Sequence, residues 1–372
     1  MRAARAEVDL GAVAHNVGVL RELVAPALVC AVVKADGYGH GSIAVSEAVL
    51  DAGADWLAVA LVEEAAVLRK AGITKPILLL SQPRLADMAA AVRFDLRICI
   101  TSMVGAELLA AAARDQGKIV LVHMKVDTGM NRIGVSPADA LALASDIWRR
   151  PELHLEGVFT HCAVADEPDN PFTAEQFDRF EEVLADLAGA GITPSIRHAA
   201  NSATAVAHPR GRYDLVRVGI ALFGIPPAPS VGNEIGLRPA MSLRAEVSAV
   251  KRVTAGEGIS YGLRYRFEND ANVATVPIGY ADGVSRRLGL NGGEVIIGGK
   301  RRRIVGVVTM DQLMVDCGDD HVEVGDEVIL IGRQGNQEIT AEEWAERLDT
   351  IAYEVVCGIG PRVPRFYLSA GG

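Results

Sequence analysis

Two different rhythms of hydrophobic and polar residues divide the chain. From residue 28 to about 220, short apolar, β-branched runs alternate with longer alanine- and leucine-rich stretches whose apolar residues recur at helical spacing. The apolar runs begin at Leu28, Trp56, Pro76, Leu96, Ile119, Leu155, Ser195 and Leu215. Near-continuous hydrophobic strands separated by helices predict a parallel sheet that is covered on its faces. The number and spacing of the runs favour a (β/α)8 barrel, with a doubly wound open sheet as the alternative.

The second rhythm follows the proline-rich stretch GIPPAPSVGNEIGLRPA and consists of short alternating strands with glycine turns. We therefore predict an α/β chain with two domains, a (β/α)8 barrel over residues 1–236 and a mostly β domain over residues 237–372. One helix is expected in the β domain, because Thr340 and Glu343 form a capping box before an amphipathic run. A similar box at Thr173–Gln176 predicts the start of an earlier helix, which Gly191 is placed to end.

A net charge of -10 gives the chain no general attraction for nucleic acid. The only dense basic run, Lys300–Arg303, lies between two apolar runs and directly after Gly298 and Gly299. We interpret it as a hairpin turn on the surface and not as a nucleic-acid contact. No segment longer than about ten residues lacks charge or turn residues, so none is expected to span a bilayer. The N-terminal stretch has no leader pattern, and we expect a cytoplasmic protein without a membrane partner.

The cysteines are widely separated and odd in number, and no two form a C-x-x-C pair. This spacing argues against a disulfide framework and against a zinc site, so we expect reduced thiols and no metal. The five are Cys30, Cys99, Cys162, Cys317 and Cys357.

Polar residues close several of the eight predicted barrel strands. In a barrel of this kind the active site lies at the carboxyl ends of the strands, so these residues should converge. The loops after the last two strands often bind phosphate through backbone N–H groups, a task that Asn201, Ser202, Gly219 and Ile220 fit. The other strand-end residues are Lys34, Lys125 with Arg132 just beyond it, His161 and Arg217.

A lysine at the mouth of an apolar barrel, near a phosphate site, suggests a Schiff base to pyridoxal 5'-phosphate. Burial lowers the pKa of a lysine, and the neutral amine is the form that an aldehyde needs. Each residue also has a simpler interpretation. Lys34 could extend its head to solvent, His161 could be a hydrogen-bonded core group, and Asn201 with Ser202 could form an ordinary helix cap.

Long motifs along nearly the whole chain resemble those of alanine racemases. They are VVKADGYGHG, KVDTGMNRIG, FTHCAVADE, HAANSA, RVGIALFG, GISYGLRY, IGYADG and TMDQLMVD. The resemblance implies a fold type III enzyme that uses pyridoxal 5'-phosphate to interconvert L-alanine and D-alanine, supplying D-alanine for peptidoglycan. It also implies a head-to-tail homodimer in which each active site takes residues from both subunits.

The resemblance further implies a role for each matching residue. Lys34 would be the Schiff-base lysine, and Tyr261 of the partner subunit would be the second base on the opposite face of the substrate. Arg132 would contact the phenolic oxygen of the cofactor, His161 would lie beside its ring and Arg217 would face its pyridine nitrogen. Phosphate would be held by Tyr38, Asn201, Ser202, Gly219 and Ile220, and the substrate side would be bordered by Arg132, Tyr280, Met310 and Asp311. Lys125 matches a lysine that is often carbamylated in relatives.

Several alternatives stay open from the sequence. Many relatives carry Ser-Tyr before Arg-Val-Pro near the C-terminus where this chain has Gly360 and Pro361, so serine or a broader set of small amino acids is an alternative substrate. A decarboxylase of the same fold type and a pyridoxal-phosphate carrier are further alternatives. The stretch GISYG also matches a hydrolase elbow around Ser260, although the residues after it are neither long nor periodic enough for the required helix.

Overall fold

The computed structural model describes residues 3–368, and the chain divides into two compact units. The barrel unit comprises residues 12–37 and 42–238. The β unit comprises the chain up to Gly11, the segment Tyr38–Gly41 and the chain from Pro239 on. Our domain boundary between residues 236 and 237 stays a prediction, because this division also assigns two earlier segments to the β unit.

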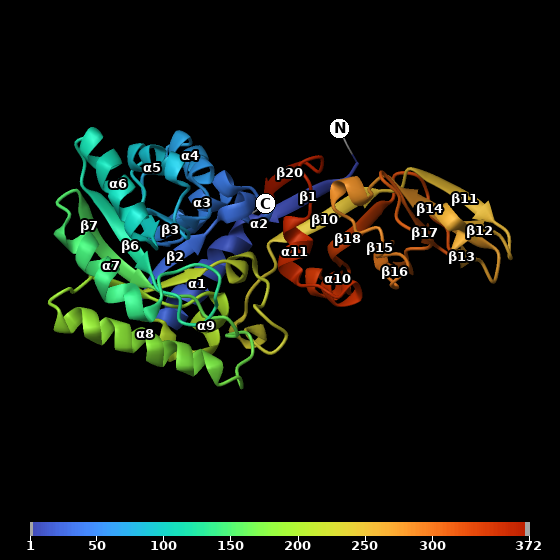
Figure 1. Ribbon diagram of the computed structural model, residues 1–372. Helices are drawn as coiled ribbons and strands as arrows, with labels where there is room; N and C mark the ends of the chain where they lie inside the picture. The colour runs from blue at the N-terminus through green and yellow to red at the C-terminus, as the bar shows by residue number, and fades with distance from the viewer. Residues whose placement is uncertain (1–2, 369–372) are drawn as a thin grey trace. The chain divides into compact units, whose positions relative to one another are not determined.

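The barrel unit contains a closed parallel barrel, which confirms the predicted fold class (Figure 1). Two four-stranded runs, in the orders β4-β3-β2-β9 and β5-β6-β7-β8, share its wall. Leu79 N–H donates to the Arg97 carbonyl at 2.9 Å and joins β4 to β5, and Asp214 N–H donates to the Arg197 carbonyl at 3.0 Å and joins β8 to β9. The open-sheet alternative is therefore wrong. The strands are β2 (Leu28–Val32), β3 (Trp56–Val59), β4 (Ile77–Leu79), β5 (Ile98–Ile100), β6 (Val120–Lys125), β7 (Leu153–Phe159), β8 (Ile196–His198) and β9 (Leu215–Val218).

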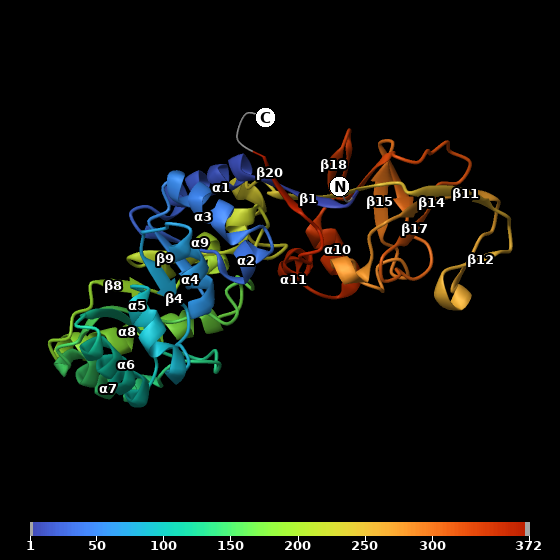
Figure 2. The ribbon, with the colours of Figure 1, turned by 90° about the horizontal axis from the view of Figure 1, so that it is seen from above.

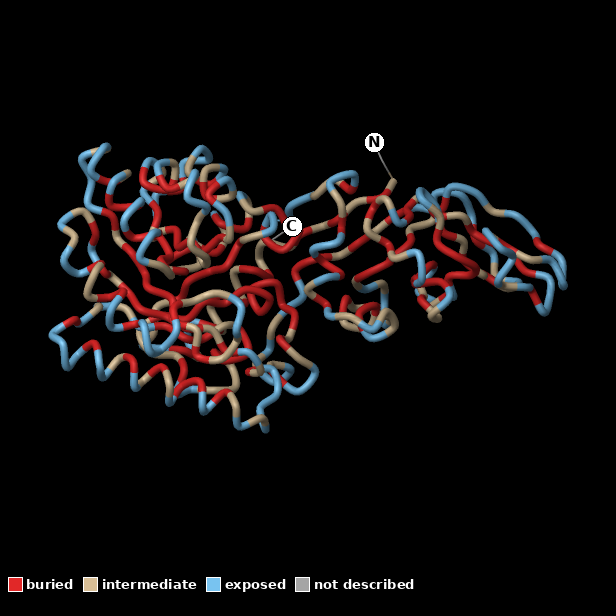
Figure 3. The backbone as a smooth tube through the Cα atoms, viewed as in Figure 1, coloured by how far each residue is buried: buried red, intermediate tan, exposed pale blue. Residues whose placement is uncertain are grey.

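Helices lie around the outside of these strands (Figure 2). Their apolar residues recur at helical spacing, and one stripe faces the barrel; α7 buries Ala140, Leu143, Ala144 and Ile147 in this way (Figure 3). The α-helices are α1 (Leu10–Val24), α3 (Ser42–Asp51), α4 (Val62–Lys70), α5 (Met88–Arg93), α6 (Met103–Asp115), α7 (Pro137–Arg149), α8 (Phe172–Gly189) and α9 (Ser202–Ala207), with the short turn α2 (Lys34–Tyr38) after β2. The 3-10 turns of this unit are η1 (Leu85–Asp87), η2 (Pro209–Gly211), η3 (Ile220–Phe223) and η4 (Asn233–Ile235).

The predicted capping box at Thr173–Gln176 is wrong. Helix α8 begins one residue earlier, at Phe172, and the residue before it, Pro171, has no side chain that can cap. The Gln176 side chain binds the loops after β6 and β7 instead. Its Oε1 accepts from Ala163 N–H at 2.8 Å, and its Nε2 donates to the Thr128 hydroxyl at 3.1 Å. The end of the helix agrees with the prediction, because Gly191 adopts a φ of 76° just beyond it.

The β unit is built on one long mixed sheet and two smaller ones. The long sheet has the order β16-β15-β18-β10-β1-β20, with β19 on β18, and a second sheet has the order β11-β14-β17. The strands are β1 (Arg5–Asp9), β10 (Met241–Glu246), β11 (Ala249–Val253), β12 (Gly258–Ile259), β13 (Tyr265–Arg266), β14 (Ala271–Val276), β15 (Glu294–Ile297), β16 (Lys300–Arg303), β17 (Leu313–Asp316), β18 (Glu327–Gln334), β19 (Gln337–Ile339) and β20 (Arg365–Leu368). Two helices, α10 (Ala341–Leu348) and α11 (Ala352–Cys357), and the 3-10 turns η5 (Tyr261–Leu263) and η6 (Tyr280–Asp282) complete the unit.

The basic run Lys300–Arg303 forms strand β16, so its prediction as the turn itself is wrong. The turn is Gly298–Gly299, with φ angles of 61° and 72°, a conformation that two consecutive glycines adopt without steric cost. Arg302 is buried and pairs with Asp320 at 3.0 Å, and Lys300 pairs with the same carboxylate at 2.9 Å. These two positive charges of the run are thus compensated inside the unit.

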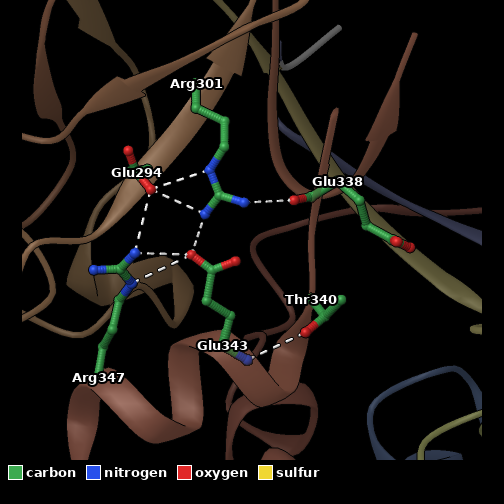
Figure 4. Close-up of polar contacts among 6 residues, drawn as sticks. All are labelled: Glu294, Arg301, Glu338, Thr340, Glu343 and Arg347. Carbon is green, nitrogen blue, oxygen red and sulfur yellow. Dashed lines mark hydrogen bonds and ion pairs between the residues drawn. The ribbon is translucent and has the colours of Figure 1, made fainter. Parts of the chain in front are cut away.

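An ion-pair cluster connects β15 and β16 to α10 (Figure 4). Glu343 pairs with Arg301 and Arg347, and Glu294 pairs with the same two arginines. Half of the predicted capping box is confirmed, because the Thr340 hydroxyl accepts from Glu343 N–H at 3.2 Å. The other half is wrong, since the Glu343 carboxylate binds the arginines instead of the cap. Among residues 3–368, no helix is long and apolar enough to cross a membrane.

Candidate active site at the carboxyl ends of the barrel strands

Lys34 follows the end of β2 and begins an unusual left-handed turn. Ala35, Asp36 and Gly37 have φ angles of 51°, 52° and 61°. A residue with a side chain costs about 1–2 kcal/mol in this conformation, so the turn needs support. Glu64 supplies it from α4, because its carboxylate accepts from Ala35 N–H at 2.6 Å and also from the backbone that leads into its own helix.

Arg217 lies on β9 and is paired in register with Cys30 of the lysine strand. Its side chain is buried, and Nη2 donates to the carbonyls of Thr160 at 2.8 Å and Ala199 at 2.9 Å. Burial lowers the pKa of Arg217 to about 10. The guanidinium is therefore still a cation at neutral pH.

His161 lies against this guanidinium, with its Nδ1 at 3.2 Å from Nη2 of Arg217. Arginine can only donate, so Nδ1 accepts and the proton of the neutral ring is on Nε2. Burial lowers the pKa of His161 well below its usual range, and the cations of Arg217, Lys125, Arg132 and Lys34 lower it further. The charges of four predicted site residues thus help to keep a fifth one neutral.

Lys125 is the last residue of β6 and is only 4% exposed. Its Nζ lies 5.5 Å from the centre of the Phe159 ring and 3.5 Å from the Leu80 carbonyl oxygen. Burial lowers the pKa of Lys125 to about 8, and the cations of Arg217 and Arg132 act in the same direction. A substantial fraction of this amine is therefore neutral and nucleophilic near neutral pH.

Arg132 is exposed in a loop that leaves β6 and returns beside it. The loop closes through Val135 N–H, which donates to the Lys125 carbonyl at 2.9 Å. Asp127 shapes it, because one carboxylate oxygen accepts from the N–H groups of Gly129 and Asn131, both at 3.0 Å. The role of Asp127 here is to hold the loop that carries Arg132.

The loops after β8 and β9 are tied together by a side chain. The Ser202 hydroxyl accepts from Gly219 N–H at 2.9 Å, which leaves its own proton to donate elsewhere. Asn201 caps α9, with its Oδ1 accepting from Thr204 N–H at 2.9 Å, so the simpler helix-cap interpretation holds for its side chain. Ile220 is buried at the start of η3. The hydroxyl proton of Ser202 suits an anionic ligand such as the phosphorylated cofactor.

The remaining predicted site residues belong to the β unit. Tyr38 is buried, and its ring centre lies 6.2 Å from that of Tyr353. Arg365 holds the same segment, because its Nε donates to the Gly39 carbonyl at 3.0 Å. A Cβ atom on Gly39 would lie 2.4 Å from the Val356 carbonyl oxygen, so the segment packs at a distance that only glycine allows.

Tyr261, Tyr280, Met310 and Asp311 are all exposed in the β unit, and Tyr261 is 70% exposed. Asp311 pairs with Arg362 at 2.7 Å. Nearby, the Ser260 hydroxyl donates to the Val307 carbonyl at 2.7 Å, and a 3-10 turn follows it. The hydrolase elbow requires a helix at this place, so that alternative is wrong.

Sequence reasoning missed the residues that support the site. Glu64 looks like an ordinary surface position of an amphipathic helix, and Gln176 was predicted as part of a capping box; only the fold shows that both bind backbone groups of the strand-end loops. It also missed two histidines that are fully buried in the barrel unit, His123 and His198. The signal for His123 was a polar residue in the middle of an apolar strand, whereas His198 follows Arg197 in the short strand β8 and gave no such signal.

The closed barrel carries a lysine, a buried arginine and further cations at its strand ends. These features are those of the class of pyridoxal-phosphate-dependent amino acid racemases of fold type III. The family model "Alanine racemase, N-terminal domain" matches residues 8–227, and "Alanine racemase, C-terminal domain" matches residues 240–367. The chain belongs to the alanine racemase family, whose members are isomerases that depend on pyridoxal 5'-phosphate. Its matches extend over both domains, so the decarboxylase and carrier alternatives are set aside.

Individual relatives agree with this assignment. The alanine racemase of Symbiobacterium thermophilum is 50% identical over 368 residues, which cover 99% of this chain and 97% of that protein. The crystal structure of alanine racemase from Streptomyces lavendulae has a TM-score of 0.94 at 41% identity and covers 100% of this chain and 98% of that one. The structure of alanine racemase from Bacillus anthracis with bound L-Ala-P has a TM-score of 0.92 at 39% identity, covering 100% and 96%.

The buried neutral histidines predict that the protein loses stability in mild acid. Burial lowers the pKa of His123 below its usual range and that of His198 well below it. In the unfolded chain a histidine titrates near pH 6.5, so below that pH the unfolded state binds protons that the folded state does not. The free energy of unfolding should therefore fall between pH 6.5 and 5.5, by up to about 1 kcal/mol for each such histidine. Urea unfolding at fixed protein concentration measures this.

A matched control is His154→Gln, which removes an exposed histidine of β7. This variant should keep the pH dependence of the parent protein. A free energy of unfolding that stays constant from pH 7.5 to 5.5 in the parent would contradict the prediction.

Proposed function

We propose that this chain racemises alanine with Lys34 and Tyr261 as its two bases, in the cytoplasm, and that the D-alanine supplies peptidoglycan precursors. The observation that carries the proposal is the contact of the buried Arg217 guanidinium with His161, at 3.2 Å, at the same strand ends where Lys34 and Lys125 lie. Alanine is the substrate assigned, because the relatives compared above are all named alanine racemases.

Pyridoxal 5'-phosphate, when bound, supplies the electron sink that makes the α-proton of an amino acid removable. Lys34 would bind it through its amine, and Arg217 would donate to its ring nitrogen. A permanent cation cannot take a proton from that nitrogen or tolerate a second positive charge beside it, so Arg217 keeps the ring nitrogen unprotonated. The other cofactor contacts would come from Arg132 at the phenolic oxygen, His161 beside the ring, and Tyr38, Asn201, Ser202, Gly219 and Ile220 at the phosphate.

Inversion of a carbon centre requires a proton to leave from one face and another to arrive at the opposite face. The Lys34 amine takes or gives the proton on one face, and the Tyr261 hydroxyl does so on the other. Each group is the acid in one direction of the reaction and the base in the reverse direction.

The exposure of Tyr261 is the reason to expect a partner subunit. Tyr261, Tyr280 and Met310 leave large side chains exposed, and such groups usually mark an interaction surface. We therefore propose a homodimer in which these residues and Asp311 border the substrate side of the partner's barrel. This arrangement gives each active site residues from two chains.

The variant Lys34→Ala tests the role of the lysine. Without the amine, the loaded protein should lose its visible absorbance, and racemisation followed by circular dichroism with L-alanine should fall by about a thousandfold or more. Lys70→Ala, which removes an exposed lysine of α4, is the control and should leave both signals unchanged. Turnover that survives in Lys34→Ala would refute the role of this lysine.

Tyr261→Phe should keep cofactor binding and lower racemisation in both directions by about 10²–10⁴-fold. Mixing this variant with Lys34→Ala tests the shared site. In a hybrid dimer one site has both mutations and the other has none. When equal amounts of the two variants exchange subunits at random, hybrid dimers form alongside the two parent dimers, and the mixture should regain about a quarter of the parent activity. Mixing Lys34→Ala with the double variant Lys34→Ala/Tyr261→Phe is the control and should restore nothing. If the mixture of Tyr261→Phe with Lys34→Ala is as inactive as each variant alone, the shared site is contradicted.

We also propose that Lys125 is carbamylated. Its neutral amine would form an N–C bond to CO2 and release one proton to solvent, and the new negative charge would be compensated by Arg132. A protein equilibrated with 13C-labelled bicarbonate should show a carbamate signal in its 13C NMR spectrum. Lys125→Gln should abolish that signal and Lys251→Gln, an exposed control, should keep it. Identical spectra for the parent and Lys125→Gln would refute the modification.

A further inference from the structure

Arg217 is a buried cation that no carboxylate contacts directly in the part of the chain that the structure describes. Its hydrogen-bond partners there are two carbonyl oxygens and two imidazole nitrogens. One of these nitrogens is Nδ1 of His198, which lies 2.8 Å from Nη1 of Arg217. Because arginine can only donate, this Nδ1 accepts, and the proton of the neutral His198 ring must be on Nε2.

From His198 on β8 the hydrogen bonds continue to His123 on β6 and then to a carboxylate on β7, the strand between them. Nε2 of His198 lies 2.9 Å from Nδ1 of His123, and Nε2 of His123 lies 3.0 Å from Oε2 of Glu156. Burial opposes the ionisation of Glu156, but the hydrogen bond from His123 and the cation of Arg97 together lower its pKa below the usual value. The ionised carboxylate can only accept, as Arg217 can only donate. Both ends of this series of hydrogen bonds therefore require the same direction from donor to acceptor. Each imidazole receives at Nδ1 and donates from Nε2.

The barrel is built to accommodate this chain of hydrogen bonds. Strand β7 contains one extra residue, Glu156, between the pairs Val122–Leu155 and His123–Gly157. A bulge of this kind redirects a side chain that regular alternation would place elsewhere. A Cβ atom at Gly157 would lie 2.2 Å from Nδ1 of His123, so the glycine leaves room for the imidazole.

The second imidazole is held as firmly as the first. His198 stacks on Phe159 with the ring centres 4.6 Å apart and the planes at 8°. Neither His123 nor His198 has any solvent-exposed surface. Water therefore cannot replace a lost partner, and a ring in the wrong tautomer would place two donors against each other.

We propose that Glu156, His123 and His198 are positioning residues that set the orientation and electrostatic environment of Arg217, and through it the ring nitrogen of the cofactor. The inference rests on the proposed role of Arg217. The carboxylate polarises His123, which polarises His198, so that part of its negative charge acts on Arg217 from the far end of the chain. The guanidinium stays charged, and the hydrogen bonds hold the orientation of its plane. Its orientation toward the ring nitrogen of the cofactor would therefore be fixed.

The first test is the tautomer of each ring in the holoenzyme. Selective 15N-histidine labelling and two-bond 1H–15N correlation spectra distinguish a proton on Nε2 from one on Nδ1. His123→Asn and His198→Asn each remove one of the eight histidines and thereby assign the signals of the two rings. We expect both His123 and His198 to be neutral, with the proton on Nε2, at every pH from about 6.5 to 9. A charged His198, or a proton on its Nδ1, would overturn the proposal whatever the variants do.

The second test separates a positioning role from a packing role. His123→Phe keeps a ring in the cavity but gives His198 no acceptor, whereas His123→Asn returns an acceptor oxygen near the position of Nδ1. In His123→Phe we expect kcat to fall about tenfold with KM nearly unchanged, together with a shift in the visible absorbance of the bound cofactor. His123→Asn should recover most of kcat and the parent absorbance, and His154→Gln should match the parent throughout.

The outcomes also distinguish this inference from the proposed function. If Lys34→Ala is inactive but His123→Phe retains the parent kcat and absorbance, the chain of hydrogen bonds is refuted and the proposed function stands. If His123→Phe and His123→Asn lose activity equally and absorb like the parent, the histidine is only structural and the proposal is again refuted. If Lys34→Ala is active, the proposed function fails, and the tautomer measurement still decides whether the directed chain exists.

Discussion

A buried guanidinium group that keeps its proton constrains the groups around it, because each of them must accept a hydrogen bond. Arg217 is such a group, and its pKa of about 10 leaves it charged at any physiological pH. Each of its hydrogen-bond partners must accept, which fixes the proton position on His161 as well as on His198. One residue thus determines the hydrogen-bonding state of two rings, and burial together with the charges of Arg217 and its neighbours keeps His161 neutral.

The barrel brings these groups together because the carboxyl ends of all its strands face the same way. Strand direction alone does not position the loops, however. Glu64 supports the left-handed turn after Lys34, Asp127 closes the loop of Arg132, and Ser202 joins the last two loops. In each case a side chain holds backbone N–H groups in place. Loops of this kind can stay irregular and still keep a fixed geometry.

The sequence predicted the barrel well because each of its strands is a short apolar run between helical stretches, a pattern that survives without knowledge of contacts. Its errors arose where a contact outweighs local preference. Gln176 matches a capping box but finds partners on two loops, and Lys300–Arg303 looks like a turn although Gly298 and Gly299 make that turn. Only the resemblance to a known family predicts that Tyr261 and Lys34 belong to one site. The spacing of residues along one chain cannot show which residues a second subunit contributes.

The extra residue of β7 has a consequence for the pairing of the strand. With Glu156 left out, the remaining partners of β6 and β7 would follow one another without a break, from Leu153 opposite Val120 to Phe159 opposite Lys125. The ladder is therefore complete without this position, and the backbone pairing gives no reason for the extra residue. What the position adds to the barrel is its carboxylate, which lies 3.0 Å from Nε2 of His123.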